Sequence, residues 1–130
     1  MPELGYEALC TAAEMRAAEE AYPGFPATMS DLMERAGAAV AHEAMRAYPQ
    51  ARRFAVVCGS GANGGDGRIS ARVLRDAGRE AVETDAVEGC EVVIDALFGT
   101  GFHGAPRPEA RELIERINSC GLPVVAVDLP

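Results

Sequence analysis

The spacing of apolar residues along the chain predicts strands alternating with helices. Short apolar runs typical of buried strands lie at residues 54–57, 81–84, 92–95 and 124–127. Stretches with apolar residues three or four positions apart lie around and between these runs and predict helices, at residues 12–22, 28–48, 68–77 and 108–117. This order predicts an α/β fold with a mostly parallel sheet.

Helix-capping residues support several of these boundaries. Thr11 and Glu14 have the spacing of a capping box, which starts the first helix. Thr28 or Ser30 caps the second helix, and Gly78 is suited to end the third.

The segment between the second and third predicted strands is short. Only residues 85–91 separate them, whereas a parallel crossover with a helix needs about a dozen residues. Two interpretations remain open: residues 81–84 form an edge fragment, or the connection is irregular.

A glycine-rich turn follows the first strand, with five glycines between residues 59 and 67. Glycine permits positive φ and lets a ligand approach bare amides, while the free N–H groups of a helix start favour a phosphate or pyrophosphate. Residues 59–64 match G-x-G-x-x-G, and Glu83 and Asp85 follow about 20 residues later, where a ribose-binding acid is expected. This fingerprint alone has low specificity.

Polar residues also follow the other predicted strands. Since parallel strands end at one edge of a sheet, Asn63, Asp66, Asp95, Thr100 and Asp128 are expected near one crevice. The structural alternative is that aspartates at strand ends cap the following turn or helix.

Composition narrows the function classes. The formal net charge is −8 and all 12 basic residues are arginine, which disfavours nonspecific nucleic-acid binding and excludes a P-loop or Schiff-base lysine. The four cysteines form no C-x-x-C pair, so a zinc site is not expected and each thiol is expected to be reduced and buried. No membrane-length apolar run or signal-peptide pattern occurs, so we expect a single cytoplasmic domain.

The glycine turn, Cys58 to Gly67, resembles that of the NAD(P)H-hydrate epimerase family, the YjeF N-terminal domain. Three further stretches resemble the family in the same order, namely residues 32–37, 95–101 and 127–130.

The resemblance implies a three-layer α/β/α Rossmann-like sandwich that epimerises the R and S forms of hydrated NADH and NADPH. The S form would pass to a partner dehydratase. By resemblance, residues contacting the dinucleotide are Ala62, Asn63, Gly64, Gly65, Asp66, Gly99, Thr100, Gly101, Phe102, His103, Gly104, Ala105 and Asp128. Asn63 and Asp95 match positions that bind a potassium ion, and our hypothesis is that Asp128 is the catalytic acid–base group.

The chain departs from the family pattern in three places. Ala62 stands where the family usually has Asn, and residues 79–91 are shorter than usual. Family members continue past the final Pro130 with Ser-Gly and further strands, so domain 1–130 is expected to be incomplete at its C-terminal end. The strand at 124–127 would then leave an open apolar edge for an oligomer or second chain to cover.

Three alternatives to an active epimerase remain open. The chain could be a non-catalytic nucleotide-binding or scaffold module of the same fold, as in relatives that serve messenger-RNA decapping or apolipoprotein binding. It could be a truncated inactive fragment, or a generic NAD-binding oxidoreductase domain.

Overall fold

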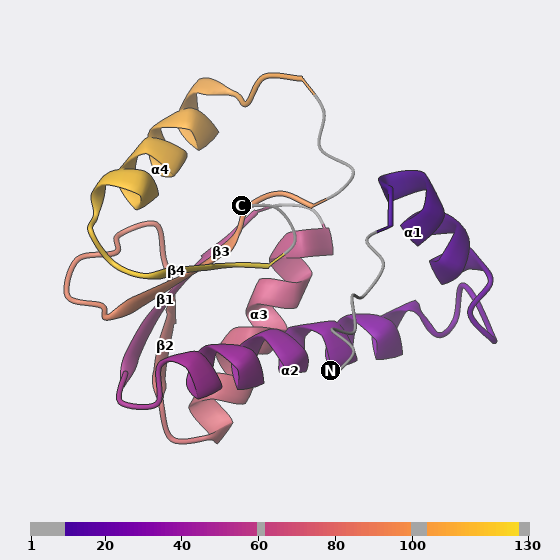
Figure 1. The fold of residues 1–130 in the computed structure, drawn as a ribbon, viewed down its shortest axis with the longest axis horizontal. Helices are drawn as coiled ribbons and strands as arrows, with labels where there is room; N and C mark the ends of the chain where they lie inside the picture. The colour runs from indigo at the N-terminus through magenta and orange to yellow at the C-terminus, as the bar shows by residue number, and fades with distance from the viewer. Residues whose placement is uncertain (1–9, 60–61, 100–103, 128–130) are drawn as a thin grey trace, which may run out of the picture.

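A computed structural model describes residues 10–59, 62–99 and 104–127, which form a four-stranded parallel sheet with helices on both faces (Figure 1). The elements are α1 (Ala12–Glu20), α2 (Met29–Ala47), β1 (Arg53–Cys58), α3 (Ala62–Asp76), β2 (Glu80–Glu83), β3 (Val92–Ala96), α4 (Pro108–Ser119) and β4 (Val124–Ala126). The predicted α/β class is confirmed.

The strand order is β2-β1-β3-β4, and every neighbouring pair is parallel. From β1 the chain passes through α3 to β2 on one side, then crosses to β3 on the other side of β1. The direction of winding therefore reverses between β1 and β3, and crevices at such reversals bind ligands in open α/β sheets.

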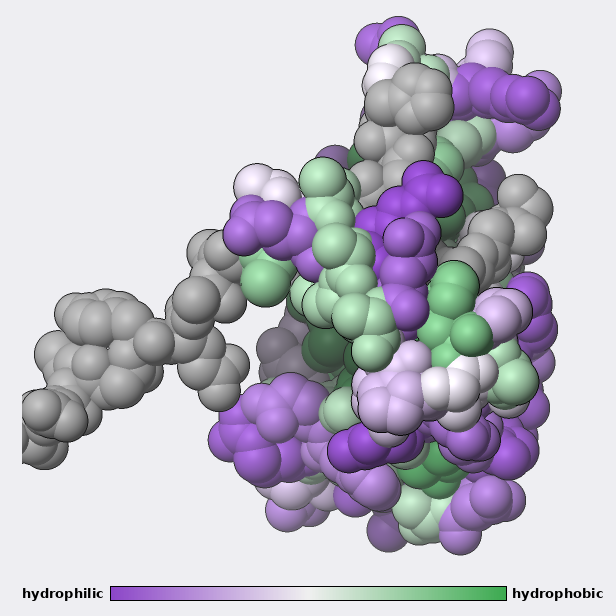
Figure 2. Space-filling model, turned by 90° about the vertical axis from the view of Figure 1, so that its right-hand side faces the viewer, coloured by the Kyte–Doolittle hydropathy of each residue, from purple (hydrophilic) through white to green (hydrophobic). Residues whose placement is uncertain are grey.

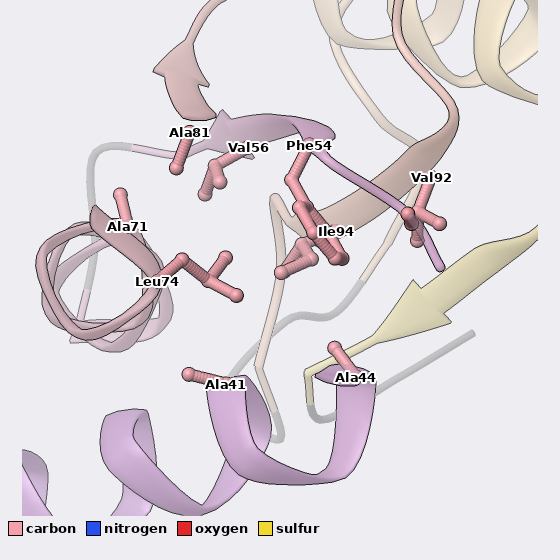
Figure 3. Packing of buried hydrophobic residues seen from close by; sticks show 10 residues of the cluster. Ala41, Ala44, Phe54, Val56, Ala71, Leu74, Ala81, Val92 and Ile94 are labelled. Carbon is pink, nitrogen blue, oxygen red and sulfur yellow. The ribbon is translucent and has the colours of Figure 1, made fainter. Parts of the chain in front are cut away.

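The core against α2 and α3 combines large strand residues with small helix residues. Phe54 and Ile94 of the sheet meet Ala41 and Ala44 of α2 and Leu74 of α3, all completely buried (Figure 3). Alanine on α2 lets that helix lie close to the sheet. The predicted three-layer arrangement is confirmed because α4 covers the other face, where Ile117 packs with strand residues.

The connection from β2 to β3 satisfies both interpretations left open by the sequence. β2 is a four-residue edge strand, and the eight residues after it contain no helix. Val87 in this connection is 2% exposed and packs with Val57 and Val93 on the α4 face. One buried valine thus occupies space that a crossover helix would cover.

The last strand is shorter and more exposed than its sequence predicts. β4 pairs only with β3 among the described residues, and Val124 is 40% exposed. The expectation of a buried-type strand is therefore wrong, because nothing described lies on its outer side. The open apolar edge expected there is present.

Helix α1 stands apart from this body (Figure 1). Its capping box is confirmed: the Glu14 amide donates to Thr11 Oγ1 at 3.1 Å, and the Thr11 amide donates to Glu14 Oε1 at 3.0 Å. No α1 side chain is buried. The face of the molecule on this side mixes hydrophilic and hydrophobic residues (Figure 2). Among the described residues, no helix has the length and hydrophobicity needed to cross a membrane.

Candidate functional site

The glycine-rich segment is mostly helical. Helix α3 begins at Ala62, six residues before the predicted start, so the segment from Asn63 to Gly67 occupies its first turns. The prediction that the glycine-rich turn extends to Gly67 is wrong, because residues 62–67 are already helical. Glycine lowers intrinsic helix propensity, and tertiary contacts override that preference here.

The contacts of these glycines explain their positions. A Cβ on Gly59 would lie 2.1 Å from the carbonyl oxygen of Leu97, and one on Gly64 would lie 1.8 Å from the carbonyl oxygen of Gly59. A Cβ on Gly67 would lie 2.6 Å from Ala96 Cβ. None of these three glycines has positive φ. They are required by close packing among the start of α3, the turn after β1 and the residues at the end of β3.

Helix α2 fixes the position of α3. Gly37 of α2 lies against Ile69, where an added Cβ would be 2.6 Å from Ile69 Cβ. The buried Ser70 hydroxyl donates to the Gly37 carbonyl at 2.7 Å and lies 2.9 Å from the Asp66 carbonyl oxygen. Gly37 therefore packs against α3. Sequence reasoning missed Ser70, because only the fold places this serine between two helices.

The first turn of α3 presents backbone amides at the sheet edge. The N–H groups of Ala62, Asn63 and Gly64 begin a 15-residue helix and have no acceptor within it. The helix dipole adds partial positive charge, so this end favours an anionic group. The predicted side-chain role of Asn63 lies outside what the structure describes.

Asp95 lies beside this turn, in β3. It is aligned with Val57 of β1 and Ala126 of β4. Its Oδ1 accepts a hydrogen bond from the Leu97 amide at 3.1 Å, so the turn-capping alternative holds for this oxygen. Burial of the half-buried carboxyl raises the pKa of Asp95, and the Leu97 hydrogen bond opposes this rise.

Backbone hydrogen bonds join the three strand ends. The Gly59 amide donates to the Ala96 carbonyl at 2.8 Å, and the Val127 amide donates to the Asp95 carbonyl at 2.9 Å. The glycine turn, Asp95 and the end of β4 therefore share one edge, as predicted. Gly99 lies three residues beyond β3, and Gly104 and Ala105 are exposed before α4. Predicted site residues outside the described residues are Thr100, Gly101, Phe102, His103 and Asp128.

Cys58 at the end of β1 is half-buried. Burial raises the pKa of its thiol, nearby Glu83 raises it further, and Arg68 lowers it. All four cysteines are free, but Cys10 is exposed and the others are half-buried, so the expectation of full burial is wrong. The described residues contain no group of three His, Cys, Asp or Glu side chains that could hold a metal ion.

A hollow of about 340 Å³ lies at the opposite end of the sheet, lined by Pro49, Gln50, Ala51, Arg52, Gly78 and Arg79. Helices α2 and α3 both end beside it, which places partial negative charge there. Arg79 Nη1 donates to the Ala51 carbonyl at 2.6 Å, a structural role. This hollow is separate from the strand ends that carry the predicted site.

A parallel sheet with a glycine turn and a helix N-terminus at its winding reversal places the chain in the Rossmann-like class of α/β domains. Within this class, the chain belongs to the family described as YjeF-related protein N-terminus, whose model matches residues 29–84 and 78–130.

Named relatives agree with this assignment. The NAD(P)H-hydrate epimerase of Limosilactobacillus fermentum is 32% identical over 157 residues, covering 95% of this chain and 74% of that protein. The bifunctional NAD(P)H-hydrate repair enzyme Nnr of Escherichia coli is 36% identical over 134 residues, covering 79% of this chain and 26% of that protein. The chain spans about a quarter of the length of the bifunctional relatives that it matches.

The crystal structure of yeast ynu0 has the same fold. Its TM-score is 0.76 at 23% identity, covering 94% of this chain and 71% of that one.

The two parts of the family match overlap at residues 78–84, which contain β2. The alignment with the E. coli relative spans 134 positions while covering 79% of this 130-residue chain, so that relative carries residues that this chain lacks.

Proposed function

We propose that this chain interconverts the R and S forms of hydrated NADH and NADPH, as an isomerase that repairs damaged nicotinamide cofactors. The observation that carries the proposal is the first turn of α3 beside Asp95 at one sheet edge. Two relatives bear the name NAD(P)H-hydrate epimerase, which supports this substrate class.

The binding roles follow from the chemistry of the edge. The pyrophosphate binds at the amides of Ala62, Asn63 and Gly64, next to Gly65 and Asp66. The second group of dinucleotide contacts is assigned to residues 99–105, on the resemblance to the family alone.

Potassium fits one part of this edge. A bound cation would offset the cost of burying the Asp95 carboxylate, which is the cost that raises its pKa. Hard cations take carboxylate, amide and carbonyl oxygens, so we assign Asp95 and Asn63 as potassium ligands. When bound, the ion supplies positive charge next to the substrate.

Asp128 serves as the acid–base group in this proposal. It protonates the substrate hydroxyl, which leaves as water while the ring nitrogen donates its lone pair to the ring. Water then adds to the opposite face of the ring and returns the proton to Asp128. The Val127 amide bonded to Asp95 brings the chain to this edge immediately before Asp128.

Partners follow from the same proposal. A dehydratase that consumes the S form acts with this chain, as the bifunctional names of several relatives support. A second copy covers the exposed outer edge of β4, and the pair works in the cytoplasm.

The deciding assay follows purified R-form hydrate by chromatography, with and without protein, in potassium and in sodium at equal ionic strength. Conversion to the S form above the protein-free rate, faster in potassium, is the expected result. Binding without conversion would point to a scaffold module, and redox turnover would point to an oxidoreductase.

Two substitutions test the assigned roles. Asp128→Asn abolishes conversion and leaves the circular dichroism spectrum unchanged, while Asp76→Asn, at the exposed end of α3, serves as a control with normal turnover. Asp95→Ala removes the difference between potassium and sodium. Normal turnover of Asp128→Asn excludes it as the acid–base group, and an unchanged potassium response excludes Asp95 as a ligand.

A further inference from the structure

The C-terminal end of β2 lies next to the strand that carries the glycine turn. β2 pairs in parallel with β1, with Glu83 aligned with Val56, and the Thr84 amide donates to the Val56 carbonyl at 3.0 Å. The chain therefore leaves β2 at the same sheet edge as the start of α3. Among the described strands, β2 is the outermost on this side.

This position has a defined role in dinucleotide binding. When a pyrophosphate lies on the helix after the first strand, the adenosine ribose reaches the end of the second strand. An acidic side chain there accepts a hydrogen bond from the ribose 2′-hydroxyl, and a 2′-phosphate meets repulsion. Glu83 is the last residue of β2 and is aligned with Val56, two residues before the end of β1.

We propose that Glu83 makes this chain selective for hydrated NADH over hydrated NADPH. The carboxylate binds the 2′-hydroxyl of the adenosine ribose and opposes a phosphate at that atom. This inference rests on the proposed epimerase function and specifies its substrate.

Arg75 adjusts the strength of this selection. Its Nη2 lies 3.4 Å from Glu83 Oε2, while its Nε donates to the Ala81 carbonyl at 2.8 Å. Both side chains of this ion pair are partly exposed, 46% for Arg75 and 38% for Glu83, so the pair is weak and solvent-screened. The Ala81 carbonyl holds Arg75 in place, so neutralising Glu83 leaves a guanidinium there to attract a 2′-phosphate.

The test measures kcat/KM of R-to-S conversion for hydrated NADH and hydrated NADPH with the full chain. Wild type favours hydrated NADH by about tenfold, as expected for repulsion between partly exposed like charges. Glu83→Gln reduces this ratio by about tenfold. The control is Glu80→Gln at the other end of β2, where Glu80 pairs with Arg53 at 2.6 Å, and it leaves the ratio unchanged.

Failure of this inference is distinguishable from failure of the proposed function. Conversion of both substrates with equal efficiency overturns the selectivity and leaves the epimerase function intact, as does an unchanged ratio in Glu83→Gln. Absence of conversion for both substrates overturns the function. In that case, calorimetry measures the affinity of the chain for ADP-ribose and for 2′-phospho-ADP-ribose. Equal affinity for the two ligands, or binding of neither, overturns the proposed selectivity.

Discussion

At Gly59 and Gly64 the chain has no room for a methyl group. The atoms that would clash are backbone carbonyl oxygens, which cannot rotate away as a flexible side chain would. Gly78 is different: its φ is +85° and an added Cβ would meet nothing within 4 Å. Close contact with backbone atoms requires glycine at positions 59 and 64, whereas the positive φ favours glycine at position 78.

Alanine substitutions separate these two requirements. Gly64→Ala destabilises the fold by about 3 kcal/mol or more, because the backbone of the turn must move. Gly78→Ala costs only about 1–2 kcal/mol, the cost of left-handed backbone for a residue with a Cβ. Urea denaturation followed by circular dichroism measures both, and equal costs would contradict the contact argument.

Asp95 makes stability depend on pH. Because its folded pKa is raised, ionisation costs stability at pH values above the folded pKa, and this cost vanishes as pH falls below the unfolded value of about 3.9. Asp95→Asn retains an oxygen acceptor for the Leu97 amide. In potassium-free buffer at pH 7, this variant unfolds a few degrees higher than wild type.

The Asp95→Asn gain shrinks as the pH falls through the raised pKa of folded Asp95, because the wild-type carboxyl then becomes protonated. Thermal unfolding over this pH range gives the profile. A gain independent of pH would show that burial of charge is not its cause.

At the scale of elements, the junction of α2 and α3 positions the site. Gly37 allows the two helices to approach, and Ser70 joins them through a buried hydrogen bond. The start of α3 is therefore supported by a helix that carries no residue of the proposed site.

Removing the Ser70 hydroxyl measures the strength of this support. Ser70→Ala lowers the free energy of unfolding by about 1–2 kcal/mol, because a buried hydrogen bond is lost. Ser119→Ala removes an exposed hydroxyl bonded to the Glu115 carbonyl at 2.8 Å and changes stability by less than about 0.5 kcal/mol. Equal losses in urea titrations would contradict the role of burial.

Local sequence signals predicted which helices and strands form, but they predicted only some of the residues at which these elements begin and end. The Thr11–Glu14 capping box and the glycine at position 78 marked helix ends correctly, because both act through nearby backbone groups. The start of α3 could not be predicted, since its glycines are explained by tertiary contacts with Gly59, Met33 and Ala96, which belong to three different parts of the chain. Asp95 was expected beside the glycine turn because parallel strands end at one edge of a sheet. The Ser70 hydrogen bond was not predictable, because it depends on how α2 and α3 pack.

At the scale of the whole molecule, the body and α1 differ in how they are held. The body has two buried clusters, one on each face of the sheet, whereas α1 buries no side chain. A side-chain hydrogen bond from Arg35 Nη1 of α2 to Tyr22 Oη, at 3.5 Å, joins α2 to the segment after α1. The family match begins at residue 29, after α1.

Proline substitutions test this difference. Ala17→Pro in α1 leaves the global free energy of unfolding unchanged within about 0.5 kcal/mol, although some helical signal is lost. Ala41→Pro in α2, at a completely buried position, costs about 3 kcal/mol or more. Hydrogen exchange of wild type then shows residues 12–20 exchanging faster than α2, and comparable protection would contradict the separation.

The helix-free return from β2 to β3 has a practical consequence for engineering. At least one longer relative carries residues that this chain lacks, and here β2 and β3 both pair with β1 across a connection that contains no helix. A foreign segment inserted next to Asp85 would avoid the buried Val87. The strand pairing of the sheet would therefore not have to be redesigned. The same splice point could carry a fluorescent or affinity label beside the ligand edge, so that occupancy is read out directly.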